Sequence, residues 1–255
     1  MSEHVLIHQA DGVLTLTLDR PDKKNALTDA MYGALSDAME AARGDAAVRV
    51  VVIRGNGDMF CAGNDLGDFL AAASGGNIAE ANVFRFIRLL GSFPKPLVAG
   101  VQGRAVGIGT TLLLHCDQVV LAEDALLTTP FVGLGLVPEA GSSVLLPALV
   151  GQRQAFAMLA MGQAMDAQAA LAAGMTNMVV PNAALDDAVA RVAAGIAAMP
   201  PGAVQATKAL MRDFAAIDAV IVREARVFAE RLQSAEAREA FTAFMEKRAP
   251  DFSKF

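Results

Sequence analysis

The first residues of the chain alternate between hydrophobic and polar positions in a way that predicts a hairpin. In Val13 to Asp19 the leucines occupy every second position, which is typical of a strand with one buried face. Val5 to Gln9 precedes this segment, and Asp11-Gly12 between the two is a favourable hairpin turn. We therefore expect an antiparallel pair of strands at the start of the chain.

Beyond the hairpin, helical and strand-like segments alternate. Thr28 is a favourable N-cap for a helix that runs to about Arg43, and Val48 to Ile53 is a continuous apolar run typical of a buried strand. The small residues of Ala71 to Asn77 are typical of a mobile surface loop. We also predict a helix over Ile78 to Leu90, strands over Leu97 to Val101, Gln118 to Leu121 and Ala125 to Leu127, and a turn over Gly103 to Gly109 that opens a helix through Leu114.

From Ser142 onward the pattern is mostly helical, with one strand-like segment at Asn177 to Val180. Pro201 stands where the first turn of another helix is expected. No linker, repeat or low-complexity tract separates the two parts of the sequence. We therefore predict one domain, with a mixed strand and helix core in residues 1–195 and a helical region in residues 196–255.

The composition is typical of a soluble globular protein. The 255 residues are 54% hydrophobic and 19% charged, which excludes a disordered chain. Gln102, Arg104 and several glycines interrupt the apolar run from Leu97 to Leu114, so we interpret it as buried core and expect no membrane span. The N-terminal residues lack the basic and apolar segments of a signal peptide, and we expect a cytoplasmic protein.

Charge and motifs exclude several classes of function. The net charge of -6 argues against nucleic-acid binding, because no general basic field attracts phosphate groups. Cys61 and Cys116 cannot form a disulfide framework and lack zinc-site spacing, so no metal is expected. Dinucleotide-binding, phosphate-loop, zincin and serine-hydrolase motifs are absent from the sequence. Neighbouring side chains at a helix end point apart, which favours a structural role for His115 beside Cys116 and Asp117.

Two glycine-containing turns are the strongest candidates for chemistry. Phe60 to Leu66 and Gly103 to Gly109 each follow an apolar strand, and each can present backbone N–H groups at the start of a helix. Two such groups that converge on one point form an oxyanion hole, whose donors each contribute roughly 2.7 to 4 kcal/mol to stabilising a transition state. The alternative is that both segments are tight turns without a catalytic role.

Five segments, in order, make the sequence resemble the crotonase family, also called the enoyl-CoA hydratase/isomerase superfamily. Leu18 to Leu27 is similar to the first CoA-contacting loop of the family, and Phe60 to Leu66 and Gly103 to Thr111 are similar to its two oxyanion segments. Gly133 to Ser143 is similar to the loop behind the acyl group, and Phe241 to Phe252 is similar to the C-terminal phenylalanine-lysine helix. This resemblance covers nearly the whole chain. It implies an α/β fold, a ClpP-like spiral of strand-strand-helix units, with a C-terminal helical trimerisation region and assembly into homotrimers or hexamers.

The resemblance also implies which residues bind an acyl-CoA thioester. The backbone N–H groups of Asn64 and Ile108 would bind the thioester oxygen, although Ile108 replaces a glycine that is usual in the family and narrows the pocket. Asp65 would help to hold the first oxyanion loop. The other implied contacts to substrate or CoA are Lys23, Ala26, Ala62, Gly63, Leu66, Phe131, Phe244 and Lys247. For each lysine, the alternative is a solvated surface charge.

The acid-base groups depart from those of the family's hydratases. Hydratases of the family use two glutamates, and the matching positions here are Thr111 and Phe131, neither of which can act as a base at neutral pH. Glu139, within Val137 to Ser143, is similar instead to the one glutamate that enoyl-CoA isomerases keep. We therefore expect Δ3,Δ2-enoyl-CoA isomerisation, in which Glu139 moves a proton and the oxyanion hole stabilises the dienolate.

Several alternatives remain for Glu139 and for the function. Apolar neighbours predict that Glu139 is buried, which would raise its pKa toward that of a useful base. It could instead cap the helix that begins near Gly141, and Asp68 and Glu80 are expected on the surface. The competing functions are an enoyl-CoA hydratase or another crotonase-type acyl-CoA reaction, and a non-catalytic acyl-CoA binding protein. No cofactor is expected apart from the CoA of the substrate.

Overall fold

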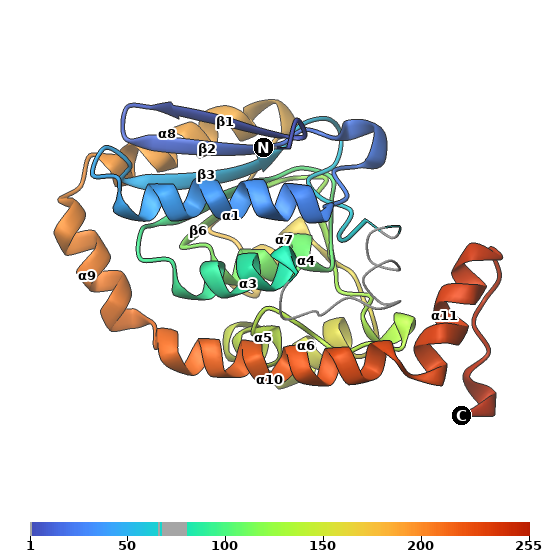
Figure 1. Ribbon diagram of the computed structural model, residues 1–255. Coiled ribbons are helices and arrows are strands. Elements are labelled where there is room, and N and C mark those ends of the chain that lie inside the picture. Colours follow the sequence, from blue (N-terminus) through green and yellow to red (C-terminus); the bar gives the residue numbers. More distant parts are fainter. Residues whose placement is uncertain (1, 66, 68–80) are drawn as a thin grey trace.

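The computed structural model describes residues 2–65, 67 and 81–255 of the chain. The expectations for Leu66, Asp68, Glu80 and the loop at 71–77 therefore lie outside the described residues. The described residues form two sheets with helices packed around them (Figure 1).

A six-stranded sheet in the order β1-β2-β3-β4-β6-β9 forms the centre of the fold. Its strands are β1 (Val5–Ala10), β2 (Val13–Leu18), β3 (Val50–Gly55), β4 (Leu97–Val101), β6 (Gln118–Ala122) and β9 (Met178–Val180). Strands β1 and β2 pair antiparallel, with Val5 opposite Leu18, which confirms the predicted hairpin. Each later pair is parallel, because the chain makes a long crossover before it adds the next strand.

A second sheet contains three short strands. β5 (Arg104–Val106) pairs parallel with β7 (Leu126–Thr128), and β7 pairs antiparallel with β8 (Met165–Asp166). The sequence analysis assigned Gly103 to Gly109 to a turn, which is wrong for the residues of β5, because these pair with β7. It also missed β8, whose two residues are too few to show a period.

Helices make up much of the remaining described chain. The α-helices are α1 (Asp29–Gly44), α3 (Asn82–Ser92), α4 (Ile108–Thr111), α5 (Ser142–Val150), α6 (Gln152–Leu159), α7 (Ala167–Ala172), α8 (Leu185–Ala197), α9 (Pro201–Met211), α10 (Phe214–Leu232) and α11 (Ala235–Met245). Short 3₁₀ segments are η1 (Pro21–Lys23), η3 (Leu112–His115), η4 (Val132–Leu134), η5 (Asn182–Ala184) and η6 (Phe252–Lys254). As predicted, the Thr28 side chain caps α1 by accepting the Met31 N–H, and Pro201 opens α9.

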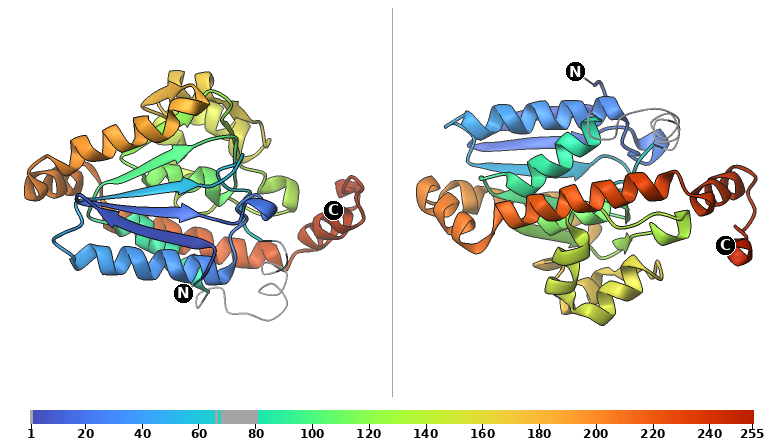
Figure 2. Two further views of the ribbon diagram at one scale, coloured as in Figure 1. Left: turned by 90° about the horizontal axis from the view of Figure 1, so that it is seen from above. Right: turned by 60° about the horizontal axis from the view of Figure 1, so that its bottom comes forward.

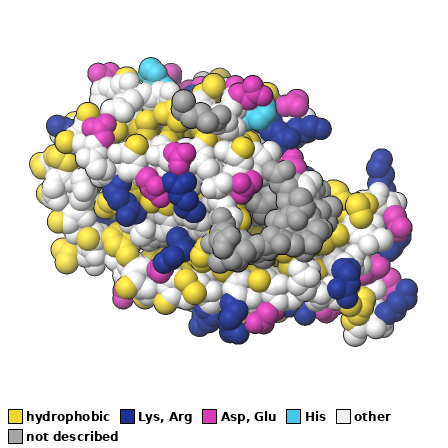
Figure 3. Space-filling model, viewed as in Figure 1, with side chains coloured by type: hydrophobic (Ala, Val, Ile, Leu, Met, Phe, Trp, Pro, Cys, Tyr) yellow, Lys and Arg dark blue, Asp and Glu magenta, His cyan; other side chains and the backbone are white. Residues whose placement is uncertain are grey.

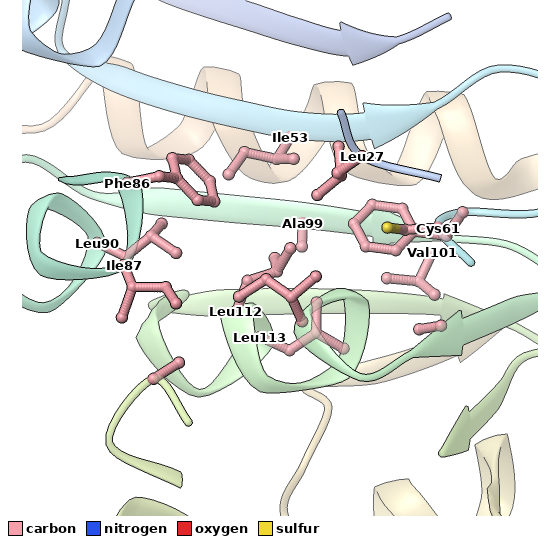
Figure 4. Packing of buried hydrophobic residues seen from close by; sticks show 14 of the residues in the cluster. Leu27, Ile53, Cys61, Phe86, Ile87, Leu90, Ala99, Val101, Leu112 and Leu113 are labelled. Atoms are coloured by element: carbon pink, nitrogen blue, oxygen red, sulfur yellow. The ribbon is translucent and has the colours of Figure 1, made fainter. Parts of the chain in front are cut away.

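The middle of the large sheet is buried on both faces, which explains why Val50 to Ile53 of β3 are all apolar. Successive side chains point to opposite faces, so Val50 and Val52 pack against α8, whereas Val51 and Ile53 face the main core with α1 and α3. Figure 4 shows Ile53 within this main core, across from Phe86 of α3. The two-sided burial holds the strand ends, and the turns that follow them, in fixed positions.

The last helices run along the molecule and beyond it. α10 packs against α3 and α5, and α11 reaches past the end of the sheet (Figures 1 and 2). Leu210 and Met211 at the end of α9 are 89% and 79% exposed. Assembly into trimers or hexamers through this region stays a prediction. None of the helices in the described ranges is long and apolar enough to cross a membrane.

The surface carries charges of both signs. On the face shown in Figure 3, basic and acidic side chains are interspersed. Ion pairs link neighbouring helices there and elsewhere, for example Arg85 of α3 with Asp37 of α1 at 2.8 Å and Arg88 of α3 with Asp218 of α10 at 2.7 Å. Exposed pairs of this kind contribute little to stability.

Candidate active site

The two glycine turns found in the sequence lie side by side. After the role that the family resemblance implies for them, which stays a prediction, we call Phe60 to Asp65 the first oxyanion turn and Gly103 to Gly109 the second oxyanion turn. Cys61 in the first and Ala105 in the second form an isolated parallel bridge, in which Cys61 O accepts the Val106 N–H at 2.9 Å. Backbone pairing of this kind fixes the two turns relative to each other without help from their side chains.

Glycine is required where the two turns touch. Gly63 has a φ of +92°, and a Cβ at this position would lie 3.1 Å from Val106 O. A Cβ on Gly109 would lie 2.9 Å from Cys61 Cβ, closer than such atoms approach in proteins. A larger residue at either position would therefore push the two turns apart.

In the described part of the chain, the Asn64 N–H of the first turn and the Ile108 and Gly109 N–H groups of the second have no acceptor. Ile108 is the first residue of α4, so its N–H has no partner within the helix. Neither this group nor the Asn64 N–H has an acceptor within residues 2–65, 67 and 81–255. The structure thus presents the two predicted donors on adjacent turns.

Tyr32 holds the side chain of Asn64. Its hydroxyl donates a short hydrogen bond to Asn64 Oδ1, and its ring packs against Phe86 with the centroids 5.6 Å apart. Burial raises the pKa of Tyr32 well above its usual value, so the hydroxyl stays protonated and donates. The sequence analysis missed Tyr32. Tyr32 could have been identified as a candidate because it is the only tyrosine of the sequence and falls on the apolar face of the helix after Thr28.

Glu139 places a carboxylate in a largely apolar cavity. Asn64 and Tyr32 line the same cavity, together with apolar side chains of α3 and α10. Glu139 Oε1 accepts a hydrogen bond from the Thr111 hydroxyl, and Oε2 is buried with no hydrogen-bond partner in the described part of the chain. Burial raises the pKa of Glu139 to about 8, although the Thr111 hydroxyl lowers it; the charge of Glu224 adds to the rise. A carboxylate whose pKa lies near neutrality is a suitable general base.

The turn that carries Glu139 has an unusual backbone. We call Glu139 to Ser143 the Glu139 turn; in it Ala140 and Gly141 have φ values of +58° and +73°. The positive φ of a non-glycine residue persists only where its surroundings enforce it. His115 supplies one restraint, because its Nε2 lies 2.7 Å from Ala140 O. Burial lowers the pKa of His115 to about 3, so its ring is neutral and donates this bond, in agreement with the structural role expected for it.

The N-terminus of α5 is capped by Glu224, and the alternative that Glu139 caps this helix is wrong. The Gly141 and Ser143 N–H groups donate to the Glu224 carboxylate of α10 at 2.6 Å and 2.9 Å. Glu139 contributes only its backbone carbonyl, which accepts from Ser142 Oγ at 2.6 Å. The Glu139 side chain is therefore directed to Thr111 and the cavity.

Known proteins resemble this chain over its whole length. Residues 8–254 match the sequence model described as enoyl-CoA hydratase/isomerase. The chain belongs to this family. The 2,3-dehydroadipyl-CoA hydratase of Escherichia coli (strain K12) is 35% identical over 254 residues, which cover 99% of both chains. Enoyl-CoA delta isomerase 2 of Rattus norvegicus is 36% identical over 254 residues, which cover 97% of this chain and 64% of the isomerase.

A solved structure confirms the predicted fold class. The crystal structure of an enoyl-CoA hydratase/isomerase from Pseudoalteromonas atlantica T6c matches with a TM-score of 0.93 and 39% identity, and covers 98% of this chain and 100% of that chain. The described chain therefore has the mixed α/β architecture of the crotonase family.

The predicted CoA loop of this enoyl-CoA hydratase/isomerase family member packs on the first oxyanion turn. Arg20 pairs with Asp65 at 2.7 Å and also donates to Ala26 O at 3.1 Å. The Ala62 N–H donates to Lys24 O at 2.9 Å. The Leu27 N–H donates to Gly63 O at 2.8 Å. These contacts bring Ala26, Ala62, Gly63 and Asp65 together, and the role of Asp65 in holding the loop around a substrate stays a prediction. Arg20 was missed, although it lies within the segment that carries the family resemblance.

Other predicted site residues lie farther from the cavity. Phe131 is buried against the second oxyanion turn, where its ring would lie 3.9 Å from a Cβ on Gly107. Lys23 is exposed and makes no ion pair with another described residue. Phe244 and Lys247 are exposed at the end of α11 and are not part of the cavity wall that the structure describes. The roles of these four residues in binding substrate or CoA stay predictions.

Proposed function

We propose that the protein converts a 3-enoyl-CoA into the 2-trans-enoyl-CoA with Glu139 as a single proton shuttle. The observation that carries this proposal is the buried Glu139 carboxylate, which faces the same cavity as Asn64 and has one oxygen free of described partners. Sequence identity does not discriminate between the family's reactions, because the hydratase and the delta isomerase are 35% and 36% identical to this chain. The proposal therefore rests on the side chains of the site.

In the proposed reaction the Asn64 and Ile108 N–H groups bind the thioester oxygen. Glu139 removes a proton from the α-carbon of the substrate, and the electrons move onto the thioester oxygen as a dienolate. The protonated Glu139 then returns the proton to the γ-carbon, which forms the 2-enoyl thioester and regenerates the carboxylate. Each oxyanion donor of this kind accelerates the reaction by about 100- to 1,000-fold.

Other carboxylates that line the cavity are engaged in hydrogen bonds or ion pairs. Asp29 accepts hydrogen bonds from Asn82 at 3.0 Å and 2.6 Å, and Asp65 pairs with Arg20. This supports Glu139 as the base, because Glu139 keeps one oxygen without a hydrogen-bond partner in the described part of the chain.

Hydration is disfavoured because it needs a second acid-base group and a bound water. At the two positions where the family's hydratases are expected to have glutamates, the chain has Thr111 and Phe131. The Thr111 hydroxyl donates to Glu139 and does not ionise near neutral pH, and Phe131 presents an apolar ring.

The test compares a 3-enoyl-CoA and a 2-enoyl-CoA of the same chain length, each incubated with wild type, Glu139→Gln and Glu123→Gln. Glu123 is exposed after β6, so Glu123→Gln removes the same charge away from the site and serves as the control. We expect wild type and the control to isomerise 3-enoyl-CoA without hydrating 2-enoyl-CoA, and Glu139→Gln to lose about 100- to 10,000-fold in rate.

Three results would overturn the proposal. Accumulation of 3-hydroxyacyl-CoA would indicate a hydratase. Isomerisation by Glu139→Gln at the rate of wild type would exclude Glu139 as the base. Acyl-CoA binding that Glu139→Gln leaves unchanged, without turnover of either thioester, would indicate a binding protein.

A further inference from the structure

Glu224 is a buried carboxylate outside the proposed proton path. Its side chain lies on α10, only 6% of its surface is exposed, and it accepts the Gly141 and Ser143 N–H groups at 2.6 Å and 2.9 Å. A buried charge is costly unless hydrogen bonds compensate it, and both oxygens of Glu224 have such partners. Burial raises the pKa of Glu224, whereas its hydrogen bonds from Ser143 and Gly141 lower it, so the N–H groups at the N-terminus of α5 favour its ionised form.

The position of this anion matters because Glu139 comes just before the same helix. The first N–H groups of a helix carry partial positive charge and stabilise a nearby carboxylate anion. Gly141, the N-cap residue of α5, has no side chain that could take up these groups. Without Glu224, the free helix end would favour the ionised form of Glu139 and weaken it as a base.

We propose that Glu224 is a positioning residue that preserves Glu139 as a proton acceptor, because it occupies the end of α5 and places a negative charge behind the Glu139 turn. This inference rests on the proposed function, in which Glu139 is the base. Glu224 also fixes the geometry of the turn, since it binds Gly141, whose φ is +73°.

The other groups around Glu139 do not replace this effect. Tyr32 of α1 and His115 of η3 are neutral near pH 7, because burial raises the pKa of the first and lowers the pKa of the second to about 3. Asp29 and Asp65 also lie near the cavity, and each has a partner of its own. The other titratable or charged described groups near the cavity or the turn are Cys61 within the first oxyanion turn, Arg212 and Lys208 beside His115, and Arg223 beside Glu224.

The test compares the pH dependence of kcat/KM for isomerisation in wild type, Glu224→Gln and Glu230→Gln. Glu230 lies exposed on the same helix, so Glu230→Gln removes an equal charge away from the Glu139 turn. In wild type, kcat/KM should rise with pH through about 8 as Glu139 ionises. We expect Glu224→Gln to shift the midpoint of this rise, here called the limb, to lower pH by roughly one unit, and to lower the plateau value of kcat/KM at high pH. Glu230→Gln should leave both unchanged.

A structural role alone gives a different result. If Glu224 only holds the fold together, Glu224→Gln lowers the plateau while the midpoint of the limb stays at the wild-type pH, and this outcome overturns the proposal. Should Glu224→Gln not fold, Glu224→Asp carries the test, because its shorter side chain draws the charge away from the Gly141 and Ser143 N–H groups. We expect the midpoint in Glu224→Asp to lie below that of wild type, and a wild-type midpoint overturns the proposal.

Thermal unfolding separates this inference from the proposed function, since it needs no substrate. Unfolding temperatures between pH 5 and pH 9 are compared for wild type, Glu139→Gln, Glu224→Gln and the double variant. A raised pKa of Glu139 makes wild type lose stability relative to Glu139→Gln as pH rises. We expect this pH-dependent difference to be smaller in the Glu224→Gln background. An equal difference in both backgrounds overturns the inference, whereas absence of isomerase activity in wild type overturns only the proposed function.

Discussion

The first oxyanion turn and the Glu139 turn are positioned by different kinds of contact. The first is held by backbone hydrogen bonds, such as those of Cys61 and Gly63 with neighbouring segments. The Glu139 turn is held mainly by side chains of other elements, His115 from η3 and Glu224 from α10. The proposed functional group of the first turn is a backbone N–H, and that of the second is a carboxylate.

This difference indicates what each turn tolerates. A backbone donor keeps its position as long as the chain path is kept, so the residue at position 64 can vary. A carboxylate base depends on burial and on nearby charges, which set its pKa. Side-chain substitutions should therefore change activity strongly around Glu139 and weakly at Asn64. At the oxyanion turns, substitutions that force the backbones apart should change activity strongly.

The largest expected effect concerns the stability of Glu139→Gln at high pH. Burial in the folded protein raises the pKa of Glu139 to about 8. Protonated Glu139 therefore makes its full contribution to the free energy of unfolding at pH values below its ordinary pKa, and this contribution is lost as the pH rises to about 8. At pH 9, Glu139→Gln should be more stable than wild type by about 2 to 4 kcal/mol, with little difference at pH 4. Chemical denaturation at both pH values measures this, and equal stability at pH 9 would show that Glu139 ionises normally.

The next effect tests the contact between the oxyanion turns. In Gly109→Ala the new Cβ would meet Cys61 Cβ at 2.9 Å, so the turns must separate. We expect a loss of about 1 to 3 kcal/mol in stability and of about 100-fold in kcat. Gly202→Ala is the matched control, because Gly202 lies in α9 outside the proposed site and a Cβ there meets no atom within 4 Å. Wild-type activity in Gly109→Ala would refute the close approach of the turns.

A smaller effect is expected for the hydrogen bond between Tyr32 and Asn64. Tyr32→Phe keeps the ring packing against Phe86 and removes the donor, which should cost about 0.5 to 1.5 kcal/mol in the free energy of unfolding. Asn64→Ala should retain activity within about tenfold of wild type, because the backbone N–H remains. A double-mutant cycle measures the interaction, and additive effects of the two changes would refute it.

The smallest effect concerns Lys23, whose predicted role is to bind the CoA phosphates. Lys23 is exposed, so an ion pair with phosphate is worth only about 0.2 to 1 kcal/mol. Lys23→Ala should therefore raise the KM for the acyl-CoA by about two- to fivefold at low salt, and the difference should fall with ionic strength. An unchanged KM at low salt would leave Lys23 as a solvated surface charge.

Much of the fold followed from local pattern. The hairpin, the cap at Thr28, the buried β3 and the opening of α9 at Pro201 each depend on residues close together in the sequence. Strand β5 was missed because its pairing with β7 is a tertiary contact, and three residues carry no period of their own.

The candidate site was predictable only where a motif marks it. Asn64, Ile108 and Glu139 stand in segments that resemble the family, and the structure presents Asn64 and Glu139 in one cavity. Tyr32 and Glu224 have no such signal, since Tyr32 reaches a partner 32 residues away and Glu224 a partner 83 residues away. Contacts over such distances depend on how the helices pack, which no local pattern encodes.

In the proposed reaction one carboxylate in a largely apolar cavity moves the proton, and label transfer tests this step most directly. A 3-enoyl-CoA that carries deuterium at the α-carbon is incubated in ordinary water with wild type, and the 2-enoyl-CoA product is analysed for deuterium at the γ-carbon. A single shuttle predicts that part of the label appears at the γ-carbon and that Glu139→Gln forms no such product. A product without label at the γ-carbon, together with wild-type turnover by Glu139→Gln, would indicate other acid and base groups and would contradict the account.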